Sequence, residues 1–351
     1  MELLQRTLQR IGEVDYNACQ EAQRRLDNLT KPPGSLGVLE SIAVQLAGIQ
    51  GHPRPELGEK VVMVMAADHG VAVEGISAFP QEVTRQMVIN FLNHGAAVNV
   101  LAQQAGARVV VTDVGITGAA LSHPDLHSRR VRPGTRNMAK EAAMTKAEAV
   151  AAVEIGIEMV SREIETGAAL IATGEMGIGN TTASSAILAC CSTAAIEEIT
   201  GRGTGLNDQV LLKKQAIIKQ SLAINQPDTD SPLDILSKVG GLEIAALTGV
   251  ILGAAAYRTP VVLDGFISTA AALIACKLNE KTKPYLLASH LSQEPGHQIM
   301  LKEIGLKPML HLDLRLGEGT GAVLAFPLIE AAVKIMHDMA TFDQAGVSNG
   351  H

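Results

Sequence analysis

From residue 60 onward the chain alternates between short apolar runs and longer segments with helical spacing. Six such runs, rich in Val, Ile, Leu or Met, stand at residues 60–66, 108–113, 168–173, 260–263, 284–288 and 309–314. Strands of a parallel sheet are apolar on both sides, because helices cover both faces of such a sheet. The pattern therefore predicts an α/β fold with a doubly wound, mainly parallel sheet of about six strands.

Helical signals dominate the first 50 or so residues. Apolar side chains at positions 3, 4, 8 and 11 recur at helical spacing, and a second helix is predicted from about residue 36 to residue 49. Between them, Pro32 and Pro33 forbid a helix, so residues 26–37 are predicted to form a partly rigid loop, for which a plain connector is the alternative. Residues 51–58 are predicted to be a linker.

Two later helices are also predicted. Thr145 with Glu148 three residues on is typical of a capping box, and Gly167 supplies the stop. A last helix is predicted from residue 324 through residue 337, and the tail 341–351 is predicted to fray. We expect this last helix to pack with the N-terminal helices. The result would be a small helical domain of residues 1–57 plus 328–351 and a large α/β domain of residues 58–327.

Polar residues follow each of the six predicted strands. The strands run in turn into Asp68 and His69, Asp113, Glu175, Asp264, Ser289 and His290, and Arg315 and Glu318. In open parallel sheets, ligands bind in the crevice outside the carboxyl ends of the strands. Polar residues at one strand end mean little, but polar residues at all of them indicate an active-site rim.

Composition narrows the possible partners. Apolar residues make up 47% of the 351 residues and aromatic residues 2%, with no Trp, so the core and any binding walls must be mainly aliphatic. The formal net charge is −7 and there is no run of Lys or Arg, which disfavours a nucleic acid or an anionic membrane as partner.

The spacing of the cysteines and the length of the apolar segments indicate the cellular compartment of the protein. The cysteines, Cys19, Cys190, Cys191 and Cys276, show no CxxC spacing, which favours a reducing environment. The N-terminal segment lacks the apolar region of a signal peptide. The longest apolar stretch, residues 244–257, is shorter than the roughly 20 residues that span a bilayer. The sequence therefore predicts a soluble, cytoplasmic protein.

A glycine-rich segment, residues 174–182, lies between a predicted strand and a predicted helix. Its backbone amides would collect at a helix N-terminus, which is a typical binding site for phosphate. The segment lacks the Gly-Lys-Ser/Thr ending of a P-loop and the GxGxxG spacing of a dinucleotide fold, so an ATPase or a dehydrogenase is not favoured. An ordinary helix cap at Asn180 or Thr181 is the alternative, and the two roles are compatible.

A second glycine-rich segment, residues 201–205, leads into a helix that carries Lys213 and Lys214. Arg202 or one of these lysines could neutralise a phosphate held by the loop. The two lysines face about a hundred degrees apart, so at most one of them reaches inward. A lysine on a solvated helix face is the alternative.

Glu318 is the strongest candidate for a reacting group. It stands between Gly317 and Gly319 directly after a predicted strand, and these two residues let the backbone turn sharply and a ligand come close. A solvated carboxylate in a plain turn is the alternative.

Metal binding and serine hydrolysis are competing interpretations of the rim. The possible metal ligands are Asp68, His69, Asp113, Asp264, His290, His297 and Asp313. None of them forms a short ligand motif such as HExxH, and hydrogen-bonded supporting roles explain them equally well. The serines lack a GxSxG elbow, which disfavours a hydrolase triad.

Six motifs together resemble one family. They are LTKPPGSLG at 29–37, ADHG at 67–70, GEMGIGNTT at 174–182, GRGTG at 201–205, EPGH at 294–297 and LRLGEGTGA at 314–322. In this order they resemble the nicotinate-nucleotide:dimethylbenzimidazole phosphoribosyltransferases of cobalamin biosynthesis, the CobT family. The resemblance covers nearly the whole chain. It implies a glycosyltransferase that moves 5-phosphoribose from nicotinate mononucleotide to 5,6-dimethylbenzimidazole, giving α-ribazole 5′-phosphate and nicotinate.

The resemblance also implies the architecture and the site. It implies a Rossmann-like large domain, a small helical domain from both termini, a homodimer, and no metal or other cofactor. Glu318 would be the general base, and Glu175 would also lie at the site. The pyridinium leaving group departs as nicotinate with a neutral ring and needs no acid, whereas the azole must lose its N–H proton, which a carboxylate can accept.

The remaining site residues are expected in two groups. The predicted phosphate- and ribose-binding residues are Gly177, Ile178, Gly179, Asn180, Thr181, Arg202, Gly203, Lys213 and Arg315. The predicted pocket for the acceptor base comprises Phe79, Gln86, Met87, Met176 and Leu316. Another azole, a purine or a phenol as acceptor, a nucleotide-binding protein without catalysis, and a metal-dependent nucleotide hydrolase remain alternatives.

Overall fold

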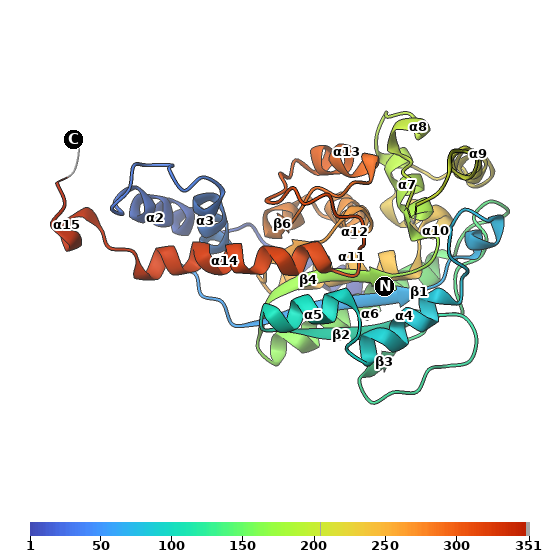
Figure 1. Ribbon diagram of the computed structural model, residues 1–351, viewed down its shortest axis with the longest axis horizontal. Helices are drawn as coiled ribbons and strands as arrows, with labels where there is room; N and C mark the ends of the chain where they lie inside the picture. Colours follow the sequence, from blue (N-terminus) through green and yellow to red (C-terminus); the bar gives the residue numbers. More distant parts are fainter. Residues whose placement is uncertain (204, 349–351) are drawn as a thin grey trace.

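A six-stranded parallel sheet runs through the centre of the molecule in the computed structural model, which describes residues 1–203 and 205–348 (Figure 1). The strands are β1 (Glu59–Ala67), β2 (Ala107–Gly115), β3 (Leu126–Ser128), β4 (Ala168–Met176), β5 (Val261–Leu263) and β6 (Leu286–Ala288). Their order is β3-β2-β1-β4-β5-β6, with every neighbouring pair parallel. The prediction of a doubly wound, Rossmann-like sheet is confirmed. The chain switches direction across the sheet between β1 and β4, where such folds bind ligands.

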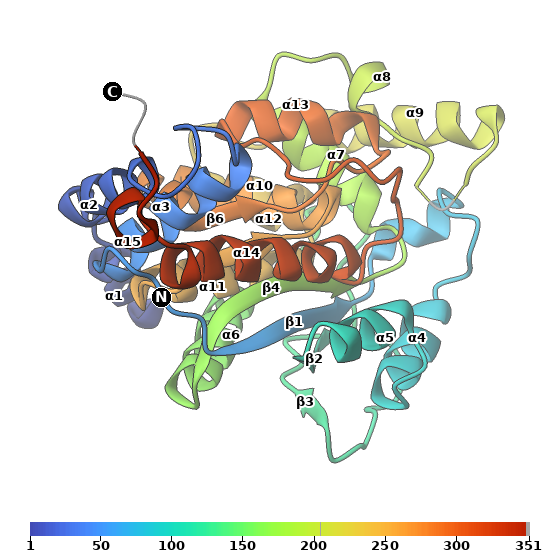
Figure 2. The same ribbon diagram turned by 60° about the vertical axis from the view of Figure 1, so that its left-hand side comes forward.

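Helices cover both faces of the sheet because its strands are apolar on both sides. On β1, Val61 and Met63 belong to one hydrophobic cluster and Val62 and Val64 to the other. The first cluster is completed by α6 (Lys146–Glu165), α11 (Leu242–Ala256) and α12 (Phe266–Leu278). The second is completed by α3 (Val38–Gln50), α5 (Ala97–Gln104) and α14 (Thr320–Asp338), and Figure 2 shows α14 lying across this face.

The remaining helices in the described part of the chain surround these layers. They are α1 (Glu2–Arg10), α2 (Tyr16–Asp27), η1 (Gly70–Glu74), α4 (Val83–Leu92), α7 (Asn180–Cys191), α8 (Ile196–Ile199), α9 (Asp208–Asn225), α10 (Pro232–Val239), η2 (Glu280–Tyr285), α13 (Pro295–Ile304) and α15 (Phe342–Ala345). Helices α7, α9 and α13 lie on the side of the molecule opposite β2 and β3 (Figure 2).

The prediction of a strand at 309–314 is wrong. That segment runs beside the chain that follows β6, with Leu291 N–H donating to the Leu310 carbonyl at 2.9 Å, but it forms only an isolated bridge to His290. It is irregular because Asp313 has a positive φ of 54° and because residues 311–313 are exposed, so no second layer covers them. Strand β3 was not predicted, since its three residues, Leu-His-Ser, carry no apolar run.

The helix predictions hold in part. Thr145 caps α6 with Glu148 as predicted. Helix α14 begins at Thr320, four residues earlier than the predicted 324, because the turn before it is capped from another strand. Of the tail predicted to fray at 341–351, residues 349–351 lie outside the described residues, and the rest is not simply frayed, since Thr341 caps the short helix α15. The division into residues 1–57 plus 328–351 and 58–327 stays a prediction, and α3, α14 and one sheet face share a single hydrophobic cluster.

Helix α14 is long and apolar enough to cross a membrane by length and composition, and it is the one such helix in the described residues. Half of it is buried inside the fold. Its buried residues, among them Phe326 and Ile329, belong to the cluster between α3 and the sheet, which is the ordinary environment of a core helix.

The close packing of α6 against α11 depends on glycine. A Cβ atom on Gly156 of α6 would overlap the Ala246 carbonyl oxygen, and one on Gly249 of α11 would overlap the Val153 carbonyl oxygen. The two backbones therefore approach more closely than side chains would allow.

We predict that Gly156→Ala lowers the free energy of unfolding by about 1–3 kcal/mol through overpacking, although alanine alone would favour the helix by about 1 kcal/mol. Gly12→Ala is the matched control, because a Cβ at Gly12 meets no atom within 4 Å, and we expect it to change stability by less than about 0.5 kcal/mol. Urea unfolding of both variants is the measurement. Equal midpoints for the two would contradict the packing argument.

Candidate active site

A cavity of about 410 Å³ opens at the carboxyl ends of β4, β5 and β6. Its volume lies within the range of small-molecule sites, roughly 300–1,000 Å³. The predicted residues that line it are Phe79, Met87, Glu175, Met176, Gly177, Ile178, Gly179, Asn180, Thr181, Gly203, Arg315, Leu316 and Glu318. The sequence segments that carry these residues therefore meet at one cavity although they are far apart in the chain. The roles of the individual residues stay predictions.

Three predicted residues do not line this cavity. Arg202 lies outside it, where it pairs with Asp208 and donates to the Leu206 carbonyl at 2.7 Å. Gln86 and Lys213 are exposed.

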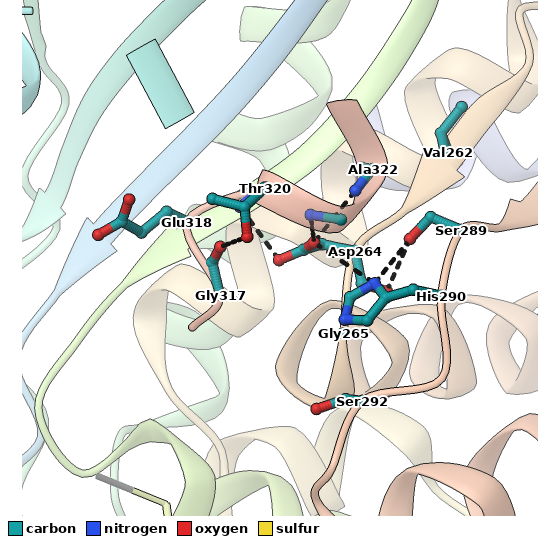
Figure 3. Close-up of polar contacts among 12 residues, drawn as sticks. Val262, Asp264, Gly265, Ser289, His290, Ser292, Gly317, Glu318, Thr320 and Ala322 are labelled. Atoms are coloured by element: carbon teal, nitrogen blue, oxygen red, sulfur yellow. Dashed lines mark hydrogen bonds and ion pairs between the residues drawn. The ribbon is translucent and has the colours of Figure 1, made fainter. Parts of the chain in front are cut away.

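Asp264, which directly follows β5, holds the turn that carries Glu318. Its carboxylate accepts backbone N–H groups from Gly321 at 2.7 Å, Gly319 at 3.1 Å and Ala322 at 3.2 Å (Figure 3). It thus caps the N-terminus of α14 from a neighbouring strand, where a negative charge is favourable. Burial raises the pKa of Asp264 to about 6, and the three N–H donors oppose that rise.

The turn itself is held in an unusual conformation. Gly317, Glu318 and Gly319 have φ angles of 88°, 66° and 102°, so three successive residues are left-handed. For glutamate this conformation is strained, at a cost on the order of 1 kcal/mol or more. The turn also packs tightly on β4, because a Cβ atom on Gly174 would overlap the Glu318 carbonyl oxygen.

The Glu318 carboxylate points away from Asp264 (Figure 3). Its Oε2 accepts the Val98 N–H at 3.5 Å, at the start of α5, and the side chain is nearly buried, with 5% of its surface exposed. Burial raises the pKa of Glu318, the Val98 N–H lowers it, and the charge of Asp264 raises it further. A carboxylate with a raised pKa beside a cavity is typical of a general base.

Glu175, at the end of β4, lies next to this turn. Its Oε1 accepts the Glu318 N–H at 3.4 Å, and its Oε2 accepts from the Asn180 side-chain amide. Burial raises the pKa of Glu175 to about 8, and the neighbouring charges of Asp264 and Glu243 add to the rise. Glu175 therefore carries a proton at neutral pH, whereas Glu318 is the carboxylate that faces a helix N-terminus.

Lys214, and not Lys213, reaches the glycine-rich loops. Its side chain is fully buried, and Nζ donates to Thr181 Oγ1 at 2.8 Å and to the Gly201 carbonyl at 3.3 Å. Burial lowers the pKa of Lys214 to about 8. Lys214 does not itself line the cavity, but its ammonium contacts Thr181, which does, so it brings positive charge close to the cavity at the N-terminus of α7. One predicted amide is already used, because Ile178 N–H donates to Thr84 Oγ1 at 3.1 Å.

Several cavity residues were not predicted as site residues. They are Ile76, Ser77, Val83, Gly265, Phe266, Ile267, His290, Ser292, Glu294 and Gly317. His290, Glu294 and Gly317 lie in segments singled out in the sequence, namely a strand end, the EPGH motif and the turn around Glu318, so position in a motif was a usable signal. The others come from helices and turns that carry no distinctive composition.

Two other carboxylates of the rim, those of Asp113 and Asp68, stabilise turns of the backbone. Asp113 accepts the Ile116 N–H at 2.8 Å and pairs with Arg130 at 2.8 Å. Asp68 accepts both the N–H and the hydroxyl of Thr117 at 2.8 Å. Within residues 1–203 and 205–348, no group of three or more His, Cys, Asp or Glu side chains is arranged to hold a metal ion.

Comparison with known proteins shows similarity along the whole chain. A sequence model described as phosphoribosyltransferase matches residues 11–347. A nicotinate-nucleotide–dimethylbenzimidazole phosphoribosyltransferase of Desulforamulus reducens is 57% identical over 351 residues, covering 100% of both chains. A protein of the same name from Halalkalibacterium halodurans is 51% identical over 348 residues, covering 99% of this chain and 97% of its own.

A solved structure is equally similar in fold. The crystal structure of CobT from Thermus thermophilus superposes with a TM-score of 0.92 at 50% sequence identity, covering 95% of this chain and 100% of the other. At this level of identity the two chains share their architecture throughout.

The proton on Glu175 predicts a pH dependence of stability. A pKa raised from 4.5 to about 8 means that the folded chain keeps a proton that the unfolded chain releases. The stabilisation is thus fully present below pH 4.5 and is lost as the pH rises toward 8. We predict that Glu175→Gln, which does not titrate, weakens the fall of the unfolding free energy between pH 5.5 and 8. Urea unfolding at several pH values tests this, and an unchanged slope would contradict it.

Proposed function

Because the chain belongs to the phosphoribosyltransferase family whose sequence model spans residues 11–347, we propose that it transfers 5-phosphoribose from nicotinate mononucleotide to 5,6-dimethylbenzimidazole. The products are nicotinate and α-ribazole 5′-phosphate, which supplies the lower ligand of cobalamin. The observation that carries this proposal is the 57% identity, over the full length, to a nicotinate-nucleotide–dimethylbenzimidazole phosphoribosyltransferase, together with a cavity in which the family motifs meet.

The two glutamates suit different tasks. In the reaction, the bond from C1′ to the nicotinate nitrogen breaks and a bond from C1′ to an azole nitrogen forms, while the azole N–H proton must leave. We assign that proton to Glu318, since its carboxylate faces the Val98 N–H, which favours the charged form. Glu175 carries a proton of its own at neutral pH, so it is suited to donate a hydrogen bond rather than to accept a proton.

The anionic end of the nucleotide has a matching site. We assign the 5′-phosphate to the N-terminus of α7, the loop around Gly203, and Lys214. Lys214 supplies a buried positive charge there, whereas Lys213 on the same helix is exposed. A phosphate would strengthen the charge of Lys214, because an adjacent anion raises the pKa of an ammonium.

The acceptor base has an apolar wall. We assign the flat dimethylbenzimidazole ring to the part of the cavity lined by Phe79, Met87, Met176 and Leu316, which are aromatic, thioether and aliphatic groups. Gln86, predicted as a polar contact of the ring, is exposed and does not line the cavity. In an apolar pocket, related acceptors differ in binding by only one or two polar contacts. Other azoles, purines or phenols are therefore alternative acceptors, and their relative turnover measures the preference of the pocket.

We also propose a homodimer. Phe79 and Leu316 line the cavity and yet are 52% and 57% exposed, and Leu312 nearby in the sequence is 44% exposed. Large apolar side chains at a cavity mouth are typical of a surface that a partner covers. A cytoplasmic location and independence from metal ions or other cofactors belong to the same proposal.

The direct test incubates the purified chain with nicotinate mononucleotide and dimethylbenzimidazole and follows nicotinate and α-ribazole 5′-phosphate by chromatography. Binding without release of nicotinate would favour a non-catalytic nucleotide-binding protein. Loss of activity on exhaustive chelation would favour a metal-dependent reaction. A panel of azoles, purines and phenols identifies the preferred acceptor.

We predict that Glu318→Gln lowers turnover by roughly 10²–10⁴-fold, the usual contribution of a general base, while nicotinate mononucleotide still binds. Steady-state kinetics measure the first effect and titration calorimetry the second. Near-normal turnover in this variant would overturn the assignment of the base. Loss of nucleotide binding as well would indicate that the side chain has a structural role.

The phosphate assignment predicts unequal effects of neighbouring lysines. We expect Lys214→Met to raise the KM for nicotinate mononucleotide at least roughly tenfold, since hydrogen bonds to charged groups contribute about 1.5–3 kcal/mol. Lys213→Met is the matched control and should leave KM within about twofold, because exposed charges contribute little. The reverse pattern would place the phosphate beside Lys213. Circular dichroism of both variants checks that the fold is kept.

A further inference from the structure

The imidazole of His290 is held in place at the lining of the cavity. Its Nδ1 lies 3.0 Å from Ser289 Oγ and 3.9 Å from Asp264 Oδ1, and 3% of the residue's surface is exposed (Figure 3). The ring also packs against Gly321, where a Cβ atom would overlap Nδ1. The ring therefore has one orientation, with Nδ1 toward Asp264 and Nε2 on the side away from Ser289.

Hydrogen bonding selects the tautomer of this ring. Ser289 Oγ lies 3.0 Å from Nδ1 and 3.3 Å from the Asp264 carbonyl, to which it can donate its hydrogen. Because the Asp264 carboxylate lies 3.9 Å from the same ring nitrogen and favours a hydrogen there, we assign the tautomer that carries the hydrogen on Nδ1. Burial lowers the pKa of His290 to about 4, which keeps the ring neutral at physiological pH.

Nε2 is thus left as an acceptor. Within residues 1–203 and 205–348 it has no hydrogen-bond partner, although the residue lines the cavity. Nε2 is not one of the fully buried polar atoms that lack a partner, so it is accessible from the cavity, where a donor on a ligand can bind it in place of water. The histidine has no task in the proton transfer assigned to Glu318, whose carboxylate points away from this ring (Figure 3).

The chemistry of the substrates limits the donor. This step rests on the proposed function. The ionised carboxylate of nicotinate offers only acceptors, and the phosphate is assigned to Lys214. The azole N–H is assigned to Glu318, which leaves the two ribose hydroxyls as donors. We propose that Nε2 of His290 accepts a hydrogen bond from a ribose hydroxyl of the nucleotide and thereby selects ribose over deoxyribose.

The test is a thermodynamic cycle that removes the His290 acceptor by substitution and the ribose hydroxyl by use of a deoxy analogue, separately and together. Wild type, His290→Phe and His290→Gln are compared with nicotinate mononucleotide and with its 2′-deoxy and 3′-deoxy analogues. Both kcat/KM and the Kd from calorimetry are measured. The intrinsic effect of a missing hydroxyl on reactivity is the same in every variant and cancels in the ratio. Phenylalanine keeps a ring but has no acceptor, whereas the side-chain amide oxygen that His290→Gln introduces can occupy the place of Nε2.

We expect removal of one hydroxyl to penalise wild type about tenfold more than His290→Phe, as a hydrogen bond of about 1.4 kcal/mol implies. His290→Gln should restore most of that selectivity. A purely structural histidine would lower kcat/KM for all three nucleotides by the same factor, and this result would overturn the proposal.

Two controls keep the outcome clear. If His290→Phe does not fold, His290→Asn replaces it, because asparagine can keep the contact with Ser289 but does not reach the position of Nε2. If wild type binds the nucleotides without releasing nicotinate, the proposed function fails, and the Kd ratios alone then decide the role of His290. Active wild type with equal deoxy penalties in all variants would reject the His290 inference and leave the proposed function standing.

Discussion

The site depends on the contact between the Asp264 carboxylate and the first turn of α14. One side chain that follows β5 receives N–H groups from Gly319, Gly321 and Ala322, while Gly319, at the N-cap of α14, has no side chain to accept them. The same carboxylate faces the Nδ1 of His290. Two walls of the cavity, one with Glu318 and one with His290, are therefore positioned from a single point in the sheet.

Burying several carboxylates together divides their roles. Burial raises the pKa of Glu175, Asp264 and Glu318; the charge of Asp264 raises the pKa of the other two, and the charge of Glu318 raises that of Glu175. The cluster cannot be fully ionised at low cost, so a proton stays on the member that burial and neighbouring charges affect most. Backbone N–H groups favour charge on Asp264, and a helix N-terminus favours charge on Glu318. Glu175, which faces the charges of Asp264, Glu243 and Glu318 together, keeps the proton.

Much of this arrangement follows from sequence patterns, and the exceptions have physical causes. The apolar runs predicted the sheet because parallel strands need two buried faces, and the polar strand ends predicted the rim. The run at 309–314 was misleading, since its alternating leucines lie along an exposed, irregular segment. The choice between Lys213 and Lys214 depends on the rotation of α9 about its axis, which is set by packing and not by local composition. Phe266 and Ile267 reach the cavity only because α12 begins there.

Under the proposed assignment of Glu318 as the base, its left-handed conformation sets the requirements of catalysis against those of stability at one residue. At a φ of 66°, glycine would be less strained than glutamate, and glycine is the residue on both sides of Glu318. A glycine at this position would relieve the strain but would remove the carboxylate. Under the proposed assignment, a substitution that stabilises this turn would therefore remove the base that the reaction needs.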